Sequence, residues 1–104
     1  MNEITVKELL QLRENKEDFQ LIDVREPSEY EAANLRGELI PLATIPQNQD
    51  KIAKDKKVVI MCRSGNRSGQ AVRFLENLGF TNLYNLKGGI LAYKAEIDPT
   101  LRVS

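Results

Sequence analysis

The only cysteine of the chain, Cys62, is the first candidate for chemistry. It directly follows a short apolar run, residues 58–61, and precedes a polar stretch that carries Arg63 and Arg67. From Ser68 onward apolar residues recur at helical spacing, so we expect a buried strand that runs into a tight loop and then a helix. Open N–H groups at a helix start and two nearby guanidinium groups favour a thiolate. The sequence therefore predicts a lowered Cys62 pKa and a reactive nucleophile.

A second interpretation of Cys62 stays open. A free cysteine is often a small buried apolar residue without chemistry. Gly65 permits backbone conformations that a larger residue would resist, so the loop could turn its N–H groups inward around an anion. Arg63 and Arg67 either hold an oxyanionic substrate or make structural ion pairs with carboxylates such as Asp23 or Glu29, and the two alternatives are equally weighted.

The absence of histidine and of a second cysteine excludes several kinds of chemistry. A Cys-His hydrolase and an internal dithiol couple are both impossible. A zinc site built from cysteine and histidine is impossible for the same reason, and no metal or other cofactor is predicted. What remains is a nucleophile that backbone N–H groups and positive charge activate, without a general base.

The loop Cys-Arg-Ser-Gly-Asn-Arg-Ser, residues 62–68, resembles the active-site loop of the rhodanese family of sulfurtransferases. Residues 21–30 resemble the first signature of that family, and residues 85–90 resemble its last. Residues 37–42 and 96–100 are especially similar to the rhodanese domain appended to adenylyltransferases that activate ubiquitin-like sulfur carriers. Three separated motifs in the right order make the resemblance specific.

The resemblance implies a sulfurtransferase that moves a sulfane sulfur from a donor such as thiosulfate to a nucleophilic acceptor through a persulfide on Cys62. It implies that substrate is bound by the rest of the loop, namely Arg63, Ser64, Gly65, Asn66, Arg67 and Ser68. A structural, supporting role is more expected for Asp23, Arg25 and Glu29 than a catalytic one. The chain departs from the family pattern at Asn34, where many members have histidine, and at Tyr93, where tryptophan is common.

The implied partners are a small anionic sulfur donor and a thiol or cyanide acceptor, with a protein acceptor also conceivable. The alternative function is a slow or non-catalytic module of rhodanese fold that carries persulfide sulfur or binds a protein, although the retained cysteine argues against an inert module. A thiol oxidation sensor would lack a resolving cysteine in this chain. Cysteine phosphatases have five residues between cysteine and arginine; here that position is Ser68, so phosphatase activity is disfavoured.

Length and composition favour one small domain, residues 1–104. Apolar residues make up 41% of the chain and charged residues 29%, which is typical of a folded globular protein. The 15 basic and 15 acidic residues cancel, and no basic stripe with interleaved aromatics indicates nucleic acid. No run reaches the roughly 20 apolar residues of a membrane span, and no signal sequence is evident, so a cytoplasmic location is predicted.

The elements expected along the chain alternate between helix and strand. We predict helices over residues 5–15, 26–33, 44–56, 68–78 and 90–97, and strands over residues 19–24, 38–42, 58–61 and 82–86. This alternation predicts an α/β fold, a three-layer sandwich with a mostly parallel central sheet and helices on both faces. Sites in such sheets lie beyond the carboxyl ends of the strands, where residues 23–25 and Cys62 both fall.

Overall fold

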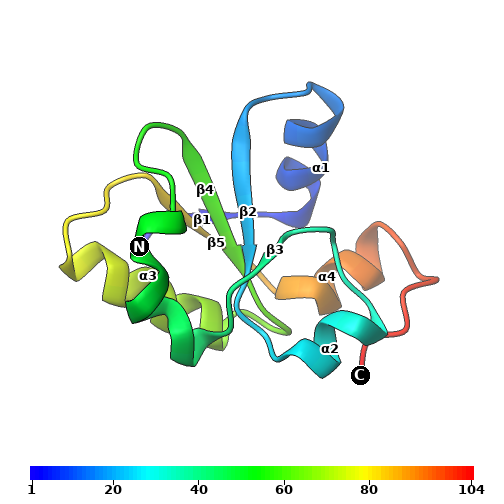
Figure 1. The fold of residues 1–104 in the computed structure, drawn as a ribbon. Coiled ribbons are helices and arrows are strands. Elements are labelled where there is room, and N and C mark those ends of the chain that lie inside the picture. Colours follow the sequence, from blue (N-terminus) through cyan, green and yellow to red (C-terminus); the bar gives the residue numbers. More distant parts are fainter.

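A computed structural model describes all residues, 1–104. Its centre is one five-stranded sheet in the order β1-β5-β4-β2-β3, and every pair of neighbouring strands is parallel (Figure 1). The strands are β1 (Glu3–Ile4), β2 (Phe19–Asp23), β3 (Glu38–Leu39), β4 (Lys57–Met61) and β5 (Leu83–Leu86). The helices are α1 (Val6–Glu14), α2 (Pro27–Ala32), α3 (Asn66–Asn77) and α4 (Gly89–Glu96), with the 3-10 helix η1 at Leu42–Lys51.

Helices cover both faces of the sheet (Figure 1). Because side chains alternate along a strand, Val58 and Ile60 of β4 face one side and Val59 and Met61 face the other. The first side packs against α3 and η1, and the second packs against α1 and α4. The resulting two apolar cores confirm the predicted α/β sandwich, and β4, flanked by β5 and β2, is buried from Val58 to Met61.

Most predicted elements are present within a residue or two of the expected bounds. Thr5 caps α1 in a capping box with Glu8, as the sequence predicts. Gly79 follows α3 with a φ of 101°, in the left-handed region expected of a helix end. The strand expected over residues 38–42 is only two residues long, although the N–H groups of Ile40 and Leu42 still donate to the carbonyls of Asp23 and Val24. Pro41 lies between them at the edge of the sheet, as the sequence predicts.

The predicted helix over residues 44–56 is wrong. The segment forms η1, which ends at Lys51, and the φ/ψ of Asn48 interrupts it. Pro46 lies inside η1 and has no N–H to donate. The Asn48 side chain donates to the carbonyl of Thr44, a contact that competes with regular helix bonds. Beyond η1, the N–H of Ala53 donates to the Gln20 side chain at 2.8 Å, so the chain turns toward β2.

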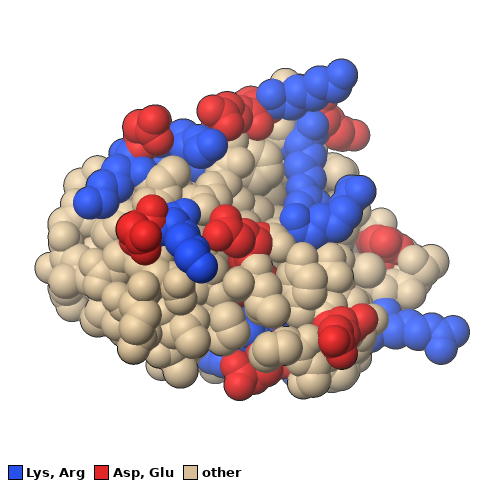
Figure 2. Space-filling view, viewed as in Figure 1, with Lys and Arg blue, Asp and Glu red and all other residues tan.

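The face of the molecule seen in Figure 2 carries charges of both signs. Figure 2 shows acidic and basic side chains interspersed, with no area of one sign covering this face. No helix has the length and apolar character that crossing a membrane requires.

Candidate active site

The end of β4 and the end of β2 are adjacent in the sheet. Asp23 pairs in register with Met61, and the N–H of Val24 donates to the Met61 carbonyl at 3.0 Å. Cys62 is the next residue after this pair. The structure therefore confirms that residues 23–25 and Cys62 meet beyond the carboxyl ends of neighbouring parallel strands.

The Cys62 side chain is buried, and its sulfur has polar partners. The residue is 1% exposed and belongs to the apolar core under α3. Yet the N–H of Gly65 donates to Sγ at 3.1 Å, and the Ser68 hydroxyl lies 3.3 Å from Sγ. Burial raises the pKa of the Cys62 thiol, but the Ser68 hydroxyl and the N–H groups of Ser68, Gly65 and Ser64 outweigh it. The net pKa is lowered, as the sequence predicts, so this cysteine differs from an ordinary core residue.

The loop that surrounds the sulfur is closed by the start of α3. Gly65 has a φ of 109°, a left-handed conformation that favours glycine, and its carbonyl accepts from the N–H of Gly69 at 3.0 Å. This turn brings the Gly65 N–H and the first turn of α3 to the same sulfur. By contrast, Arg63, Asn66 and Arg67 make no hydrogen bond to Sγ. Of the predicted loop residues, Gly65 and Ser68 thus contact the sulfur.

The start of α4, at the paired glycines Gly88 and Gly89, is hydrogen-bonded to the beginning of the cysteine loop. The N–H of Ile90 donates to the Cys62 carbonyl at 3.0 Å, and the N–H of Leu91 donates to the Arg63 carbonyl at 3.1 Å. A Cβ on Gly89 would lie 2.4 Å from both carbonyl oxygens. The sequence marks Gly88 and Gly89 only as a turn, whereas the structure shows that α4 starts against the cysteine loop.

The two arginines of the loop have different surroundings. Arg67 makes a bidentate ion pair with Glu29 of α2, with nitrogen–oxygen distances of 2.7 and 2.9 Å. The Arg63 side chain is exposed, and its Nε donates to the backbone oxygen of Ser104 at 2.9 Å. Of the alternatives that the sequence leaves open, Arg67 thus takes the ion pair with Glu29.

The Glu29–Arg67 ion pair makes the stability of the fold depend on pH. Hydrogen bonding to Arg67, helped by the N–H of Glu26, lowers the pKa of Glu29 from 4.5 to about 2 despite partial burial. A carboxylate with a lowered folded-state pKa stabilises the fold above pH 4.5, and the contribution is lost as pH falls toward 2. We expect Glu29→Gln to cost about 1–2 kcal/mol at neutral pH, allowing for solvent screening of the partly exposed pair.

Urea unfolding of parent and Glu29→Gln at a series of pH values checks this expectation. The difference in unfolding free energy between the two is expected to shrink between pH 4.5 and about 2. Asp18→Asn is the matched control, because the Asp18 carboxylate that pairs with Lys56 is 86% exposed. A Glu29→Gln difference that stays constant across that range would contradict the assigned pair.

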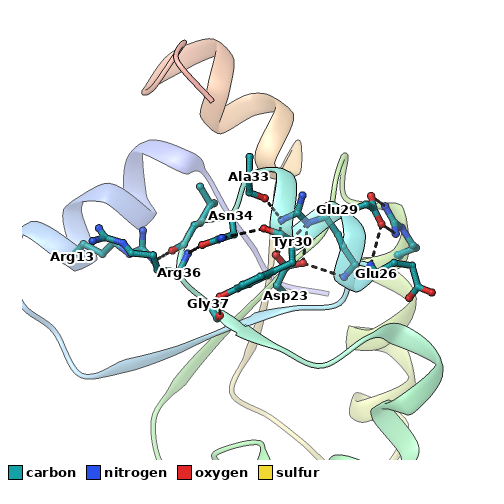
Figure 3. A network of polar contacts seen from close by, with 12 residues as sticks. Arg13, Asp23, Glu26, Glu29, Tyr30, Ala33, Asn34, Arg36 and Gly37 are labelled. Atoms are coloured by element: carbon teal, nitrogen blue, oxygen red, sulfur yellow. Dashed lines mark hydrogen bonds and ion pairs between the residues drawn. The ribbon is translucent and has the colours of Figure 1, made fainter. Parts of the chain in front are cut away.

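Asp23 and Arg25 form a second, fully buried ion pair. Both side chains have no exposed surface, and the Arg25 Nη2 lies 2.8 Å from the Asp23 carboxylate. The same Nη2 donates to the carbonyl of Ala33 at 2.8 Å, which ties the end of β2 to the end of α2 (Figure 3). Tyr30 of α2 adds a hydrogen bond from its hydroxyl to the Gly37 carbonyl at 2.7 Å. These contacts fit the supporting role predicted for Asp23, Arg25 and Glu29.

One residue near the sulfur escaped sequence reasoning. Asn85 of β5 is 5% exposed, and its Oδ1 lies 2.5 Å from the Ser68 hydroxyl. Its Nδ2 donates to the Gly65 carbonyl at 3.1 Å. A buried amide between apolar neighbours in a short strand was the available signal, because such a group needs partners.

The arrangement can stabilise an anionic sulfur without a general base. No group of three or more His, Cys, Asp and Glu side chains is placed to hold a metal ion. None of the surface hollows is lined by residues 62–68. One hollow lies between η1 and α3 and is lined by Ile45, Pro46 and Phe74 with their neighbours.

Comparison with known proteins identifies a matching family and similar proteins. Residues 5–96 match the model of the rhodanese-like domain family. A protein named Sulfurtransferase from Allochromatium vinosum is 40% identical over 94 residues, covering 89% of this chain and 88% of that protein. The Mycobacterium tuberculosis protein named "Probable adenylyltransferase/sulfurtransferase MoeZ" is 32% identical over 101 residues, covering 94% of this chain but only 26% of that protein.

The fold agrees as well. The crystal structure of a rhodanese-like domain protein from Staphylococcus aureus superposes with a TM-score of 0.83 at 31% identity, covering 100% of this chain and 99% of that one. The family match covers most of the chain, including the cysteine loop and the paired glycines. The chain therefore belongs to the rhodanese-like domain family.

Proposed function

We propose that the chain is a sulfurtransferase that moves a sulfane sulfur from a donor such as thiosulfate to a nucleophilic acceptor through a Cys62 persulfide. One observation carries the proposal: the only thiol of the chain lies at the end of β4, and Gly65 N–H and the Ser68 hydroxyl contact its sulfur. The relative named Sulfurtransferase, aligned over nearly its whole length, supports the same activity.

The transfer consists of two displacements on one sulfur atom. In the first, a lone pair of the Cys62 thiolate attacks the outer sulfur of thiosulfate, and the electrons of its S–S bond leave with sulfite. In the second, the acceptor attacks the outer sulfur of the persulfide, and the electrons of that S–S bond return to Cys62. Hydrogen bonds to charged groups contribute about 1.5–3 kcal/mol each, so the donors around the sulfur lower the cost of each anion.

The two loop arginines differ in their availability to an anionic donor. Arg67 already has Glu29 as a bidentate partner, so its charge is largely neutralised at the loop. Arg63 follows Cys62 in the chain and is exposed, with its Nε on the Ser104 backbone oxygen, and it is the group with which we expect an oxyanionic donor to pair.

A persulfide carrier for a protein acceptor is the second candidate. Arg63, Ser64 and Asn66 of the loop are exposed, and no enclosed hollow for a small substrate lies over them. An open surface of this kind lets another protein bring its own nucleophile to the outer sulfur. Both candidates share the Cys62 persulfide and differ only in the acceptor.

Sulfur loading tests the proposal. Incubation with thiosulfate is expected to add the mass of one sulfur atom to the parent and none to Cys62→Ser, because serine cannot form a persulfide. Intact mass spectrometry measures the gain. Turnover with cyanide or a small thiol would then identify an enzyme, and loading without turnover would identify a carrier. Absence of loading, together with hydrolysis of an aryl phosphate, would overturn the proposal in favour of a phosphatase.

A further inference from the structure

Four groups around the Cys62 sulfur form a closed ring of hydrogen bonds. Gly65 N–H donates to Sγ at 3.1 Å, and the Gly65 carbonyl accepts from Asn85 Nδ2 at 3.1 Å. The other end of the Asn85 amide lies 2.5 Å from the Ser68 hydroxyl, and that hydroxyl lies 3.3 Å from Sγ. The ring therefore links the loop, α3 and β5 through one buried sulfur.

The direction of each bond follows from which atoms carry protons. The Gly65 carbonyl can only accept, so the Asn85 Nδ2 must face it and Oδ1 must face Ser68. Oδ1 has no proton, so at 2.5 Å the Ser68 hydroxyl donates to it. A serine hydroxyl has a single proton, and Ser68 cannot donate fully to Oδ1 and to Sγ at the same time.

The charge of the sulfur decides which acceptor receives that proton. A neutral thiol donates its own S–H to Ser68 Oγ, and the inner sulfur of a persulfide is only a weak acceptor. In both states the hydroxyl of Ser68 stays on Asn85. A thiolate on Cys62 is a charged acceptor and forms the stronger bond, so the hydroxyl turns to it.

We propose that Asn85 is a positioning residue that competes with the Cys62 sulfur for the Ser68 proton, so that the hydroxyl moves to the sulfur only when the sulfur is a thiolate. This inference rests on the proposed sulfur transfer. When an acceptor attacks the outer sulfur of the persulfide, the S–S bond breaks and its electron pair returns to Sγ. The Ser68 hydroxyl turns from Oδ1 to Sγ at that moment and stabilises the departing thiolate. In the loading step the hydroxyl turns back as the charge leaves Sγ.

None of the charged groups near the ring takes over the role of the Ser68 hydroxyl. Asp23 and Arg25 at the end of β2 are paired with each other, and Glu29 of α2 is paired with Arg67 of α3. Arg63 is exposed on the loop. After β5, Lys87 lines a hollow with Thr5 and Glu96 on the side of α1 and α4. The Met1 terminus also lies near the ring, because a Cβ placed on Gly69 would lie 3.9 Å from the Met1 side chain and 3.5 Å from Asn85 Nδ2. Since α-amino groups ordinarily titrate near neutral pH, the test follows alkylation of the thiol itself, which reports Cys62 alone.

The test is a double-mutant cycle on the pH dependence of Cys62 alkylation by iodoacetamide, measured by intact mass. Ser68→Ala removes the donor and is expected to raise the alkylation midpoint by about one to two pH units. Asn85→Leu removes the competitor and is expected to lower the midpoint. In the Ser68→Ala background the same Asn85→Leu change is expected to have no effect, because no proton is left to compete for.

Controls separate this role from a structural one. Asn82→Leu removes another partly buried amide, which donates to the Ala53 and Lys56 carbonyls away from the sulfur, and is expected to leave the midpoint unchanged. Ser68→Thr keeps a hydroxyl and is expected to restore the midpoint of the parent. Asn85→Ala takes the place of Asn85→Leu if the larger side chain prevents folding. An Asn85 effect of equal size with and without Ser68, or a raised midpoint in Asn85→Leu, would overturn the proposal.

Sulfur loading provides a second measurement that depends on the transfer itself. With thiosulfate and a thiol acceptor both present, Ser68→Ala is expected to carry a larger persulfide fraction than the parent, because its departing thiolate lacks a donor. The alkylation experiment needs no sulfur donor. If the proposed function is wrong, the parent takes up no sulfur from thiosulfate, but the effects of the variants on the alkylation midpoint remain as expected. If instead the role of Asn85 is wrong, Asn85→Leu changes the midpoint equally with and without Ser68.

Discussion

Asp23→Asn is expected to destabilise the fold by about 3–5 kcal/mol, because it leaves the guanidinium of Arg25 buried without its charge partner. Arg25 has no exposed surface, and three of its contacts with Asp23 involve the carboxylate and the guanidinium, at 2.8–3.1 Å. The Arg25 Nη1 already lacks a hydrogen-bond partner, and the other acceptor of the guanidinium, the Ala33 carbonyl, carries no charge to compensate it. Typical domains are stable by only 5–15 kcal/mol, and the loss would be a large share of the total.

Urea unfolding followed by circular dichroism measures the loss. Asp18→Asn, at an exposed ion pair, is the matched control and is expected to change the unfolding free energy little. Asp23→Asn combined with Arg25→Met removes both charges and is expected to recover most of the loss, because well-packed apolar groups can replace a buried pair. If Asp23→Asn were as mild as Asp18→Asn, the buried pair would not be what ties the end of β2 to α2.

Four of the five strands and the cysteine loop could be predicted because their signals are local, whereas the two-residue strand β1 was not predicted. The apolar run of β4 is bounded by lysines and glycine-bearing polar residues, and the apolar spacing after Ser68 is helical. Helix α3 nevertheless begins at Asn66, two residues earlier than that spacing indicates, because the left-handed turn at Gly65 allows it. Periodicity reports the buried face of a helix, and the first turn of α3 lies on the loop rather than in the core.

The contacts between distant segments could not be predicted. The sequence offered both Asp23 and Glu29 as ion-pair partners for the loop arginines, whereas in the structure Asp23 pairs with Arg25 and Glu29 pairs with Arg67. A carboxylate on α2 reaches α3 only because β2 and β4 are neighbours. Asn85 was missed for the same reason: it meets Ser68 across the pairing of β5 with β4, which the order of residues in the chain does not specify.

In the wrongly predicted helix over residues 44–56, the buried residues were predicted correctly but the backbone conformation was not. Its polar residues and the spacing of Ile45 and Ile52 suggested one amphipathic helix, and both isoleucines are buried in the core as expected. Two buried anchors, however, do not fix the backbone between them. Pro46 and the side-chain contact of Asn48 break that backbone into η1 and a turn.

Gly89→Ala is expected to loosen the cysteine loop and to cost about 3 kcal/mol or more. Gly89 has a φ of 60°, where a side chain costs about 1 kcal/mol, and its Cβ would lie 2.4 Å from the carbonyl oxygens of Cys62 and Arg63. Those two carbonyls accept the N–H groups of Ile90 and Leu91, each bond contributing about 1 kcal/mol. Relief of the contact must move α4 away from the loop, and both bonds are then lost.

Gly79→Ala is the control that separates backbone strain from this contact. Gly79 also has a positive φ, 101°, but nothing lies within 4 Å of its added Cβ. It is expected to lose only about 1 kcal/mol in urea unfolding. Gly89→Ala is also expected to raise the pH midpoint of Cys62 alkylation, because a displaced loop no longer aims the Gly65 N–H at the sulfur. Equal losses of stability in the two variants, with an unchanged midpoint, would mean that α4 does not hold the loop in place.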